Sequence, residues 1–157
     1  MNELKVFLDT NILFDYLSGR VPFYAPARNL AIMSAFGDIR LFVSGKSFTD
    51  IFYVMKRLTD PKNIQDLFVS CMYLVDVCSL EKEDIEAACK LGWDDFEDAL
   101  IAASATKVGA DYLVTRDSAF PKFNIPVCTP EEVGELFKAR GISYAEVNLN
   151  DIDLDEI

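Results

Sequence analysis

Histidine is absent from this 157-residue chain, and its absence removes two kinds of chemistry. A histidine general base is excluded, and so is a zinc site built on imidazole ligands. The four cysteines are far apart and form no CxxC pair that could bind zinc without histidine. We therefore interpret them as reduced thiols of the core: Cys71, Cys78, Cys89 and Cys128.

Long apolar runs are lacking as well. No apolar stretch reaches the roughly 18 residues that span a bilayer, and the amino terminus lacks the basic-then-apolar order of a signal peptide. We expect a cytoplasmic protein without membrane contact. A chain of 157 residues with 51% hydrophobic content can bury one sizeable core. The expected organisation is one domain over residues 1–141, followed by an acidic extension over residues 142–157.

Positive charge is scarce, and the net charge of −11 at first argues against a nucleic-acid partner. The distribution of charge weakens that argument. Residues 151–157 carry a cluster of acids, whereas residues 40–62 carry five basic and two acidic residues, a local net charge of +3. RNA therefore remains a candidate partner. The candidates for phosphate contacts are Lys46, Lys56, Arg57 and Arg116.

Short β-branched or aromatic runs alternate with helical patterns along the chain. The runs predict strands over residues 4–9, 39–44, 73–80, 111–117 and 125–128. Helices are predicted over residues 26–36, 47–58 and 95–108, and a last helix between Thr129 and Gly141. This alternation predicts a three-layer α/β/α fold with a mostly parallel central sheet of about five strands.

Four aspartates are expected at one edge of this sheet. Ligands of open parallel sheets bind beyond the carboxyl ends of the strands, where Asp9 and Asp117 follow two predicted strands. Asp50 and Asp98 lie in helices that follow the same edge. Each aspartate alone could be a helix cap or a solvated charge, but clustered carboxylates repel one another unless cations neutralise them. An all-oxygen ligand set favours Mg²⁺ or Mn²⁺.

Five segments in order carry a family resemblance. "FLDTN", "SFTD", "DFEDALIAASA", "ADYLVTRD" and "IPVCTPEEV" together resemble a PIN domain, over about residues 4–136. This family of Mg²⁺- or Mn²⁺-dependent endoribonucleases includes the VapC-type toxins of toxin–antitoxin pairs.

The resemblance implies roles for seven residues. The implied metal ligands are Asp9, Asp98 and Asp117. Asp50 stands where the family more often has glutamate, and would complete the cluster or orient the attacking water. The supporting residues are Asn11 and Thr115, which would orient the acids, and Asp95, which would hold a water molecule.

The implied reaction is hydrolysis of single-stranded or looped RNA, and the implied partners are a second copy of the chain and an antitoxin. Two alternatives remain open. A haloacid-dehalogenase-like phosphatase also has an aspartate after its first strand, but Asn11 stands where its DxDxT motif needs a second acid. The other alternative is a PIN-like interaction module without catalytic activity.

Overall fold

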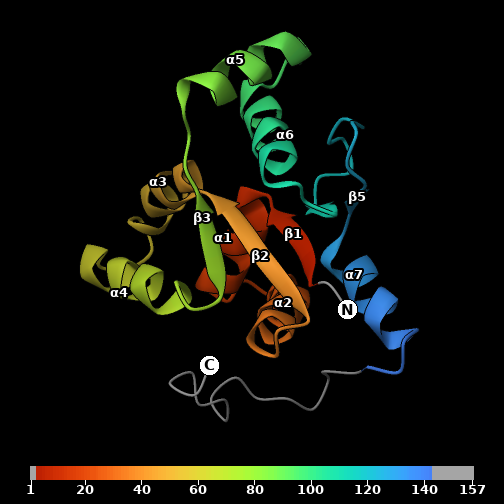
Figure 1. The fold of residues 1–157 in the computed structure, drawn as a ribbon. Coiled ribbons are helices and arrows are strands. Elements are labelled where there is room, and N and C mark those ends of the chain that lie inside the picture. Colours follow the sequence, from red (N-terminus) through yellow and green to blue (C-terminus); the bar gives the residue numbers. More distant parts are fainter. Residues whose placement is uncertain (1–2, 143–157) are drawn as a thin grey trace.

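The computed structural model describes residues 3–142 and centres on a five-stranded sheet in the order β3-β2-β1-β4-β5 (Figure 1). All neighbouring strands pair in parallel. The strands are β1 (Leu4–Leu8), β2 (Ile39–Ser44), β3 (Val75–Cys78), β4 (Tyr112–Val114) and β5 (Val127–Cys128). The chain moves outward from β1 to β3 and then returns to the other side of β1 with β4. Such a reversal opens a crevice at the carboxyl ends of the two strands, the usual ligand site of open α/β sheets.

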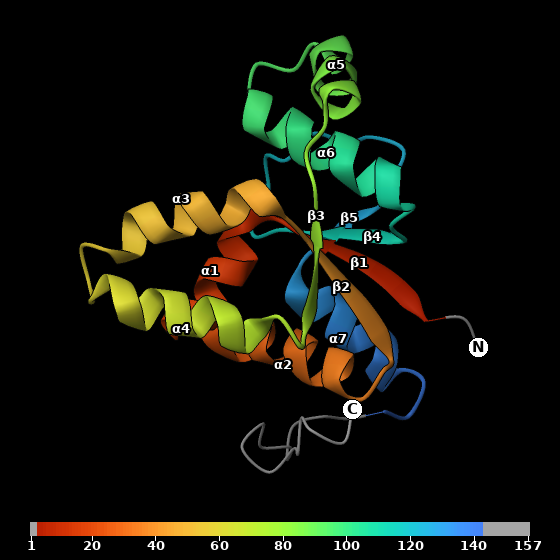
Figure 2. The same cartoon turned by 60° about the vertical axis from the view of Figure 1, so that its left-hand side comes forward.

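Seven helices within residues 3–142 cover both faces of this sheet, which gives the predicted three layers (Figure 2). They are α1 (Thr10–Ser18), α2 (Tyr24–Ala35), α3 (Gly45–Met55), α4 (Pro61–Cys71), α5 (Lys82–Leu91), α6 (Phe96–Val108) and α7 (Pro130–Lys138). The alternating side chains of β1 explain the two layers of core. Val6 and Leu8 pack with α1, α2 and α7, whereas Phe7 packs with α6 on the opposite face.

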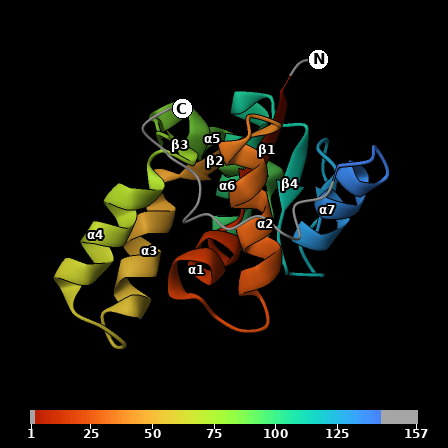
Figure 3. The ribbon, with the colours of Figure 1, turned by 90° about the horizontal axis from the view of Figure 1, so that it is seen from below.

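Helices α3 and α4 form a hairpin beside the β3 edge of the sheet, as the view from below shows (Figure 3). Phe48 and Phe68 join the two helices in an edge-to-face contact with ring centroids 5.1 Å apart. Because Asp60 caps the amino end of α4 through the backbone N–H of Lys62, the turn between the helices is fixed locally. The hairpin therefore holds α3 at a defined angle beside the sheet.

The structure confirms the predicted fold class and the five strands, with corrections at their ends. The strand predicted to run to Asp117 ends at Val114, because Thr115 turns its side chain to Asp9 and Asp117 begins a turn. Helices α1, α4 and α5 were not among those predicted. The cysteine prediction holds for Cys71 and Cys78, which are buried, but is wrong for Cys89, which is exposed on α5.

Two predictions concern the carboxyl-terminal segment and the relation of the protein to membranes. Apart from Ile142, the acidic extension predicted for residues 142–157 lies outside the described residues. Within residues 3–142, no helix is both long and apolar enough to cross a membrane.

Candidate metal and catalytic site

Asp9 lies at the carboxyl end of the central strand and is only 6% exposed. It is the N-cap of α1, since its Oδ1 accepts a hydrogen bond from the backbone N–H of Thr10 at 2.8 Å. Its Oδ2 accepts a second hydrogen bond from Thr115 Oγ1 at 2.7 Å. The backbone N–H of Asp9 also donates to the carbonyl of Val114 at 2.9 Å, which joins the ends of β1 and β4. Asp9 is therefore both a helix cap and a fixed carboxylate in the crevice.

Thr115 and Asn11 connect Asp9 to the loop after β4. Besides donating to Asp9, Thr115 Oγ1 accepts hydrogen bonds from the backbone N–H of Asp117 at 3.0 Å and from Asn11 Nδ2 at 3.3 Å. Asn11 Oδ1 in turn accepts from the backbone N–H of Arg116 at 3.5 Å. Because Thr115 is only 2% exposed, its hydroxyl is shielded from water, and the network fixes the backbone that carries Asp117.

The amino end of α6 brings further carboxylates to the same place. Asp95 is the N-cap of this helix and accepts a hydrogen bond from the backbone N–H of Asp98 at 3.2 Å. Asp98 itself is half-buried in the first turn, and its side chain accepts no hydrogen bond from the described residues. Local capping therefore explains Asp95 but not Asp98.

These side chains line one cavity of about 480 Å³ at the crevice. It brings together the four predicted acids and two of the three predicted supporting residues: Asp9, Asp50, Asp98, Asp117, Asn11 and Asp95. The third, Thr115, lies beneath the cavity, where it bonds Asp9. The cavity also has residues that sequence reasoning missed: Thr10, Phe14, Arg20 and Glu97.

Glu97 is the most consequential of the missed residues. Its Oε1 accepts a hydrogen bond from Thr10 Oγ1 at 3.3 Å, and Ser47 Oγ lies 2.8 Å from the same threonine oxygen. Burial raises the pKa of Glu97, and the charges of Asp9 and Asp50 raise it further. The available signal was the "DFED" segment, whose last two acids share the first turn of one helix, although acids there are ordinarily explained by the helix dipole.

Lys46 introduces positive charge into this acidic cavity. Its Nζ lies 2.5 Å from Asp50 Oδ2, one helical turn further along α3, and its charge also opposes the rise in the pKa of Glu97. Asp50 is thus already paired with a cation, whereas no cation of the described residues is among the groups that shift the pKa of Asp98. The cavity consequently has a neutralised half and an acidic half.

The carboxylates in the acidic half of the cavity repel one another. Burial raises the pKa of Asp98 to about 6, and repulsion from Asp95, Asp9, Asp117 and Glu97 contributes to the rise. Burial also raises the pKa of Asp9, although the hydrogen bonds from Thr115 and Thr10 oppose this. Carboxylates that perturb one another in a crevice are typical of functional sites and favour a bound cation.

The predicted phosphate contacts divide into two groups. Arg116 lines the cavity, but its guanidinium forms a two-pronged ion pair with the buried Asp15, at 2.5 Å and 3.1 Å, and lies over the ring of Phe23. Lys46 also lines the cavity. Lys56 and Arg57 instead lie over the ring of Tyr53 near the end of α3 and do not line it.

The donor set of the cavity fits a hard divalent cation, since every ligand it offers near Asp98 is a carboxylate or amide oxygen. Within residues 3–142, no three acid or cysteine side chains are already arranged around a common metal position. Carboxylates with no cation between them repel one another, which opposes a close arrangement of these side chains.

Comparisons with known proteins agree with this fold. The sequence profile of the PIN domain family matches residues 5–119. Ribonuclease VapC1 from Aquifex aeolicus (strain VF5) is 27% identical over 141 residues, covering 86% of this chain and 96% of that protein. The structure of Mycobacterium tuberculosis VapC20, a sarcin–ricin-loop-cleaving toxin, superposes with a TM-score of 0.59 at 16% identity, covering 73% of this chain and 92% of that one. A chain of a toxin–antitoxin complex from Klebsiella pneumoniae superposes with a TM-score of 0.61 at 21% identity, covering 80% of this chain and 97% of that one. Because the family profile matches well over half of the chain, this chain belongs to the PIN domain family.

Proposed function

We propose that this protein is a Mg²⁺- or Mn²⁺-dependent endoribonuclease that hydrolyses single-stranded RNA. The observation that carries the proposal is the group of mutually repelling carboxylates in the crevice between β1 and β4 of a PIN domain. A phosphatase of the haloacid-dehalogenase type loses its support, because the chain belongs to another family. The relationship to ribonuclease VapC1 supports the choice of RNA as substrate.

Asp9, Asp98 and Asp117 are the proposed metal ligands. A bound divalent ion lowers the pKa of a water molecule and stabilises the charge that develops on the scissile phosphate. Asp9 is held rigidly by Thr10 and Thr115, and the same threonine holds the backbone of Asp117. The chain therefore holds the Asp9 carboxylate and the backbone of Asp117 in place at two strand ends, beside Asp98 on a helix.

Asp50, Asp95 and Glu97 have supporting roles in this proposal. Asp50 fixes the ammonium group of Lys46, which gives the cavity a cation that can contact a phosphate oxygen. Asp95 is exposed at the cavity and can hold a water molecule by a hydrogen bond, while it also caps α6. Glu97, through Thr10, connects α6 to the first turn of α1.

We further propose that the protein acts in the cytoplasm as the toxin of a toxin–antitoxin pair. The likeness to a chain of the Klebsiella pneumoniae complex and to the VapC20 toxin supports this role. A homodimer and an antitoxin covering the acidic cavity are the expected assemblies.

The decisive experiment is an RNA cleavage assay with and without Mn²⁺, on the wild type and on two matched variants. Asp98→Asn removes a proposed metal ligand, and Asp94→Asn alters an exposed aspartate outside the cavity in the same segment. We expect Mn²⁺-dependent cleavage by the wild type and by Asp94→Asn, and a loss of at least about 100-fold in Asp98→Asn. Equal activity of the two variants, or no cleavage by the wild type, would contradict the proposal. The latter result would favour the non-catalytic module.

A further inference from the structure

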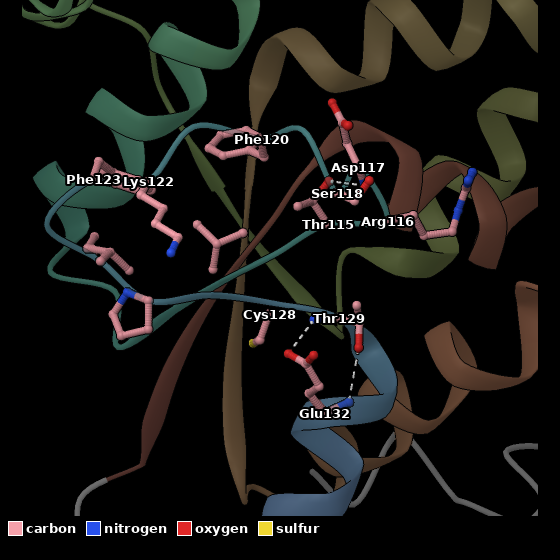
Figure 4. A pocket seen from close by; sticks show the side chains of 13 residues that line it. Thr115, Arg116, Asp117, Ser118, Phe120, Lys122, Phe123, Cys128, Thr129 and Glu132 are labelled. Carbon is pink, nitrogen blue, oxygen red and sulfur yellow. Dashed lines mark hydrogen bonds between the residues drawn. The ribbon is translucent and has the colours of Figure 1, made fainter.

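A second cavity of about 480 Å³ adjoins the acidic one (Figure 4). It lies between the loop over residues 115–126, strand β5 and the first turn of α7. Two residues line both cavities: Arg116 and Asp117. An RNA strand that passes over Asp117 can therefore enter both cavities. The volume of the second cavity is within the range of about 300–1,000 Å³ that is typical of small-ligand sites.

The interior of the second cavity is apolar and aromatic. Phe120 and Phe123 line it, and Trp93 lies behind both rings in edge-to-face contacts with centroid distances of 5.9 Å and 5.9 Å. Ile125 and Pro126 contribute further apolar surface. Aromatic and apolar walls of this kind accept the flat face of a nucleobase, because every base can stack regardless of its sequence.

The charges on the cavity indicate how a nucleotide would be oriented. Lys122 extends its ammonium group into the space between the loop and β5, and it forms no hydrogen bond or ion pair with the other described residues (Figure 4). At the opposite wall, Glu132 and Thr129 are bonded to each other in the capping box of α7. The carboxylate of Glu132 repels a phosphate, whereas the free ammonium group of Lys122 attracts one.

We infer that this second cavity binds an unpaired nucleobase of the RNA substrate, in the nucleotide next to the scissile phosphodiester. Lys122 contacts the phosphate of that nucleotide, and the base enters between Phe123 and the apolar side of β5. The inference rests on the proposed ribonuclease function and deepens it: the cavity accepts only a base that has left its stack, so the substrate must be single-stranded at this position.

Trp93 allows binding to be measured separately from cleavage, because it is the only tryptophan of the chain. We would titrate the inactive Asp98→Asn variant in EDTA with adenosine and cytidine 5′-monophosphates, and with ribose 5-phosphate as a probe without a base. Tryptophan fluorescence is excited selectively and read at each step. Saturable quenching by the two nucleotides, with no response to ribose 5-phosphate, is the expected result. No response to either nucleotide, or an equal response to ribose 5-phosphate, would overturn the inference.

Two lysine variants identify the site of binding. Lys122→Ala should weaken the binding of the nucleotides about fivefold to tenfold, whereas Lys138→Ala, at the far end of α7, should not change it. In the active protein, Lys122→Ala should act mainly on KM for RNA. An equal effect of the two variants, or an effect on kcat alone, would contradict a nucleotide site at Lys122.

The outcomes keep this inference separate from the proposed ribonuclease function. Nucleotide binding at Trp93 without RNA cleavage by the wild type would refute the ribonuclease and retain the base site. Cleavage of RNA without nucleotide binding would retain the ribonuclease and refute the base site.

Discussion

Asp98→Asn should stabilise the folded protein in the absence of divalent cations. The pKa of Asp98 rises from 3.8 to about 6, which corresponds to at most about 3 kcal/mol at about 1.4 kcal/mol per unit. Because the side chain is only half-buried, solvent screening reduces the expected gain to about 1–2 kcal/mol. Its carboxylate accepts no hydrogen bond from residues 3–142, so the amide loses no such contact with them.

The pH dependence of this effect has a defined sign. A carboxyl group whose pKa is raised on folding binds its proton more tightly in the folded state, so the folded state loses stability as pH rises from about 4 to about 6. The cost is absent below pH 4 and constant above pH 6. We therefore expect wild type and Asp98→Asn to have similar stability at pH 4, and the variant to be the more stable at pH 7.

Thermal unfolding in EDTA at both pH values measures the difference. A gain of 1–2 kcal/mol corresponds to an increase in Tm of roughly 2–8 °C for a protein of about this size. Asp94→Asn, next to the same helix but outside the cavity, is the control and should show no such pH-dependent gain. An Asp98→Asn variant no more stable than wild type at pH 7 would refute the claim that the carboxylates repel one another.

Further predictions concern the metal, the hydrogen-bond network, acid stability and the chain end. Millimolar Mn²⁺ should raise the Tm of the wild type, and Asp9→Asn, which retains the helix cap, should abolish the shift in the same thermal scan. Thr115→Val should reduce the rate of RNA cleavage about 10-fold to 100-fold, since it removes the hydroxyl that holds Asp9; an unchanged kcat would exclude that positioning role. The hydrogen bond from Lys107 lowers the pKa of Asp84. The stabilising effect of this hydrogen bond is therefore present above pH 4 and disappears as pH falls below 3.8. The stability of Asp84→Asn, measured by unfolding, should depend less on pH in that acid range than the stability of the wild type. Deletion of residues 151–157 should leave the Tm nearly unchanged and strengthen RNA binding at low salt only, and equal affinities at low salt would exclude competition by this acidic segment.

The sheet could be predicted from the sequence because its central strands are buried on both faces. The segments "VFL" and "LFV" of these strands are apolar and contain β-branched and aromatic residues, and Gly37 and Gly109 mark the helix ends before two of the strands. Helix α1 was missed because it begins immediately after Asp9, with no loop to separate strand from helix. Half of the residues of helix α5 are charged, and the helix packs mainly against α6, so its pattern of apolar residues is weak.

The acids of the site could be predicted because strand ends and helix starts of an α/β fold have known positions. Asp9 and Asp117 are placed by topology alone. The pairing of Lys46 with Asp50 and the contact of Thr10 with Glu97 depend on the angle at which α3 and α6 meet the sheet. That angle is set by packing between segments far apart in sequence, for which a single sequence gives no signal.

The most direct test of the central claim is the position of Mn²⁺ in crystals of the protein, located by its anomalous scattering. The account predicts a peak in the crevice between β1 and β4, at a ligand distance of about 2.1 Å from carboxylate oxygens of Asp9, Asp98 and Asp117. A crystal at saturating Mn²⁺ with no peak at these carboxylates, or with a peak only elsewhere, would contradict it.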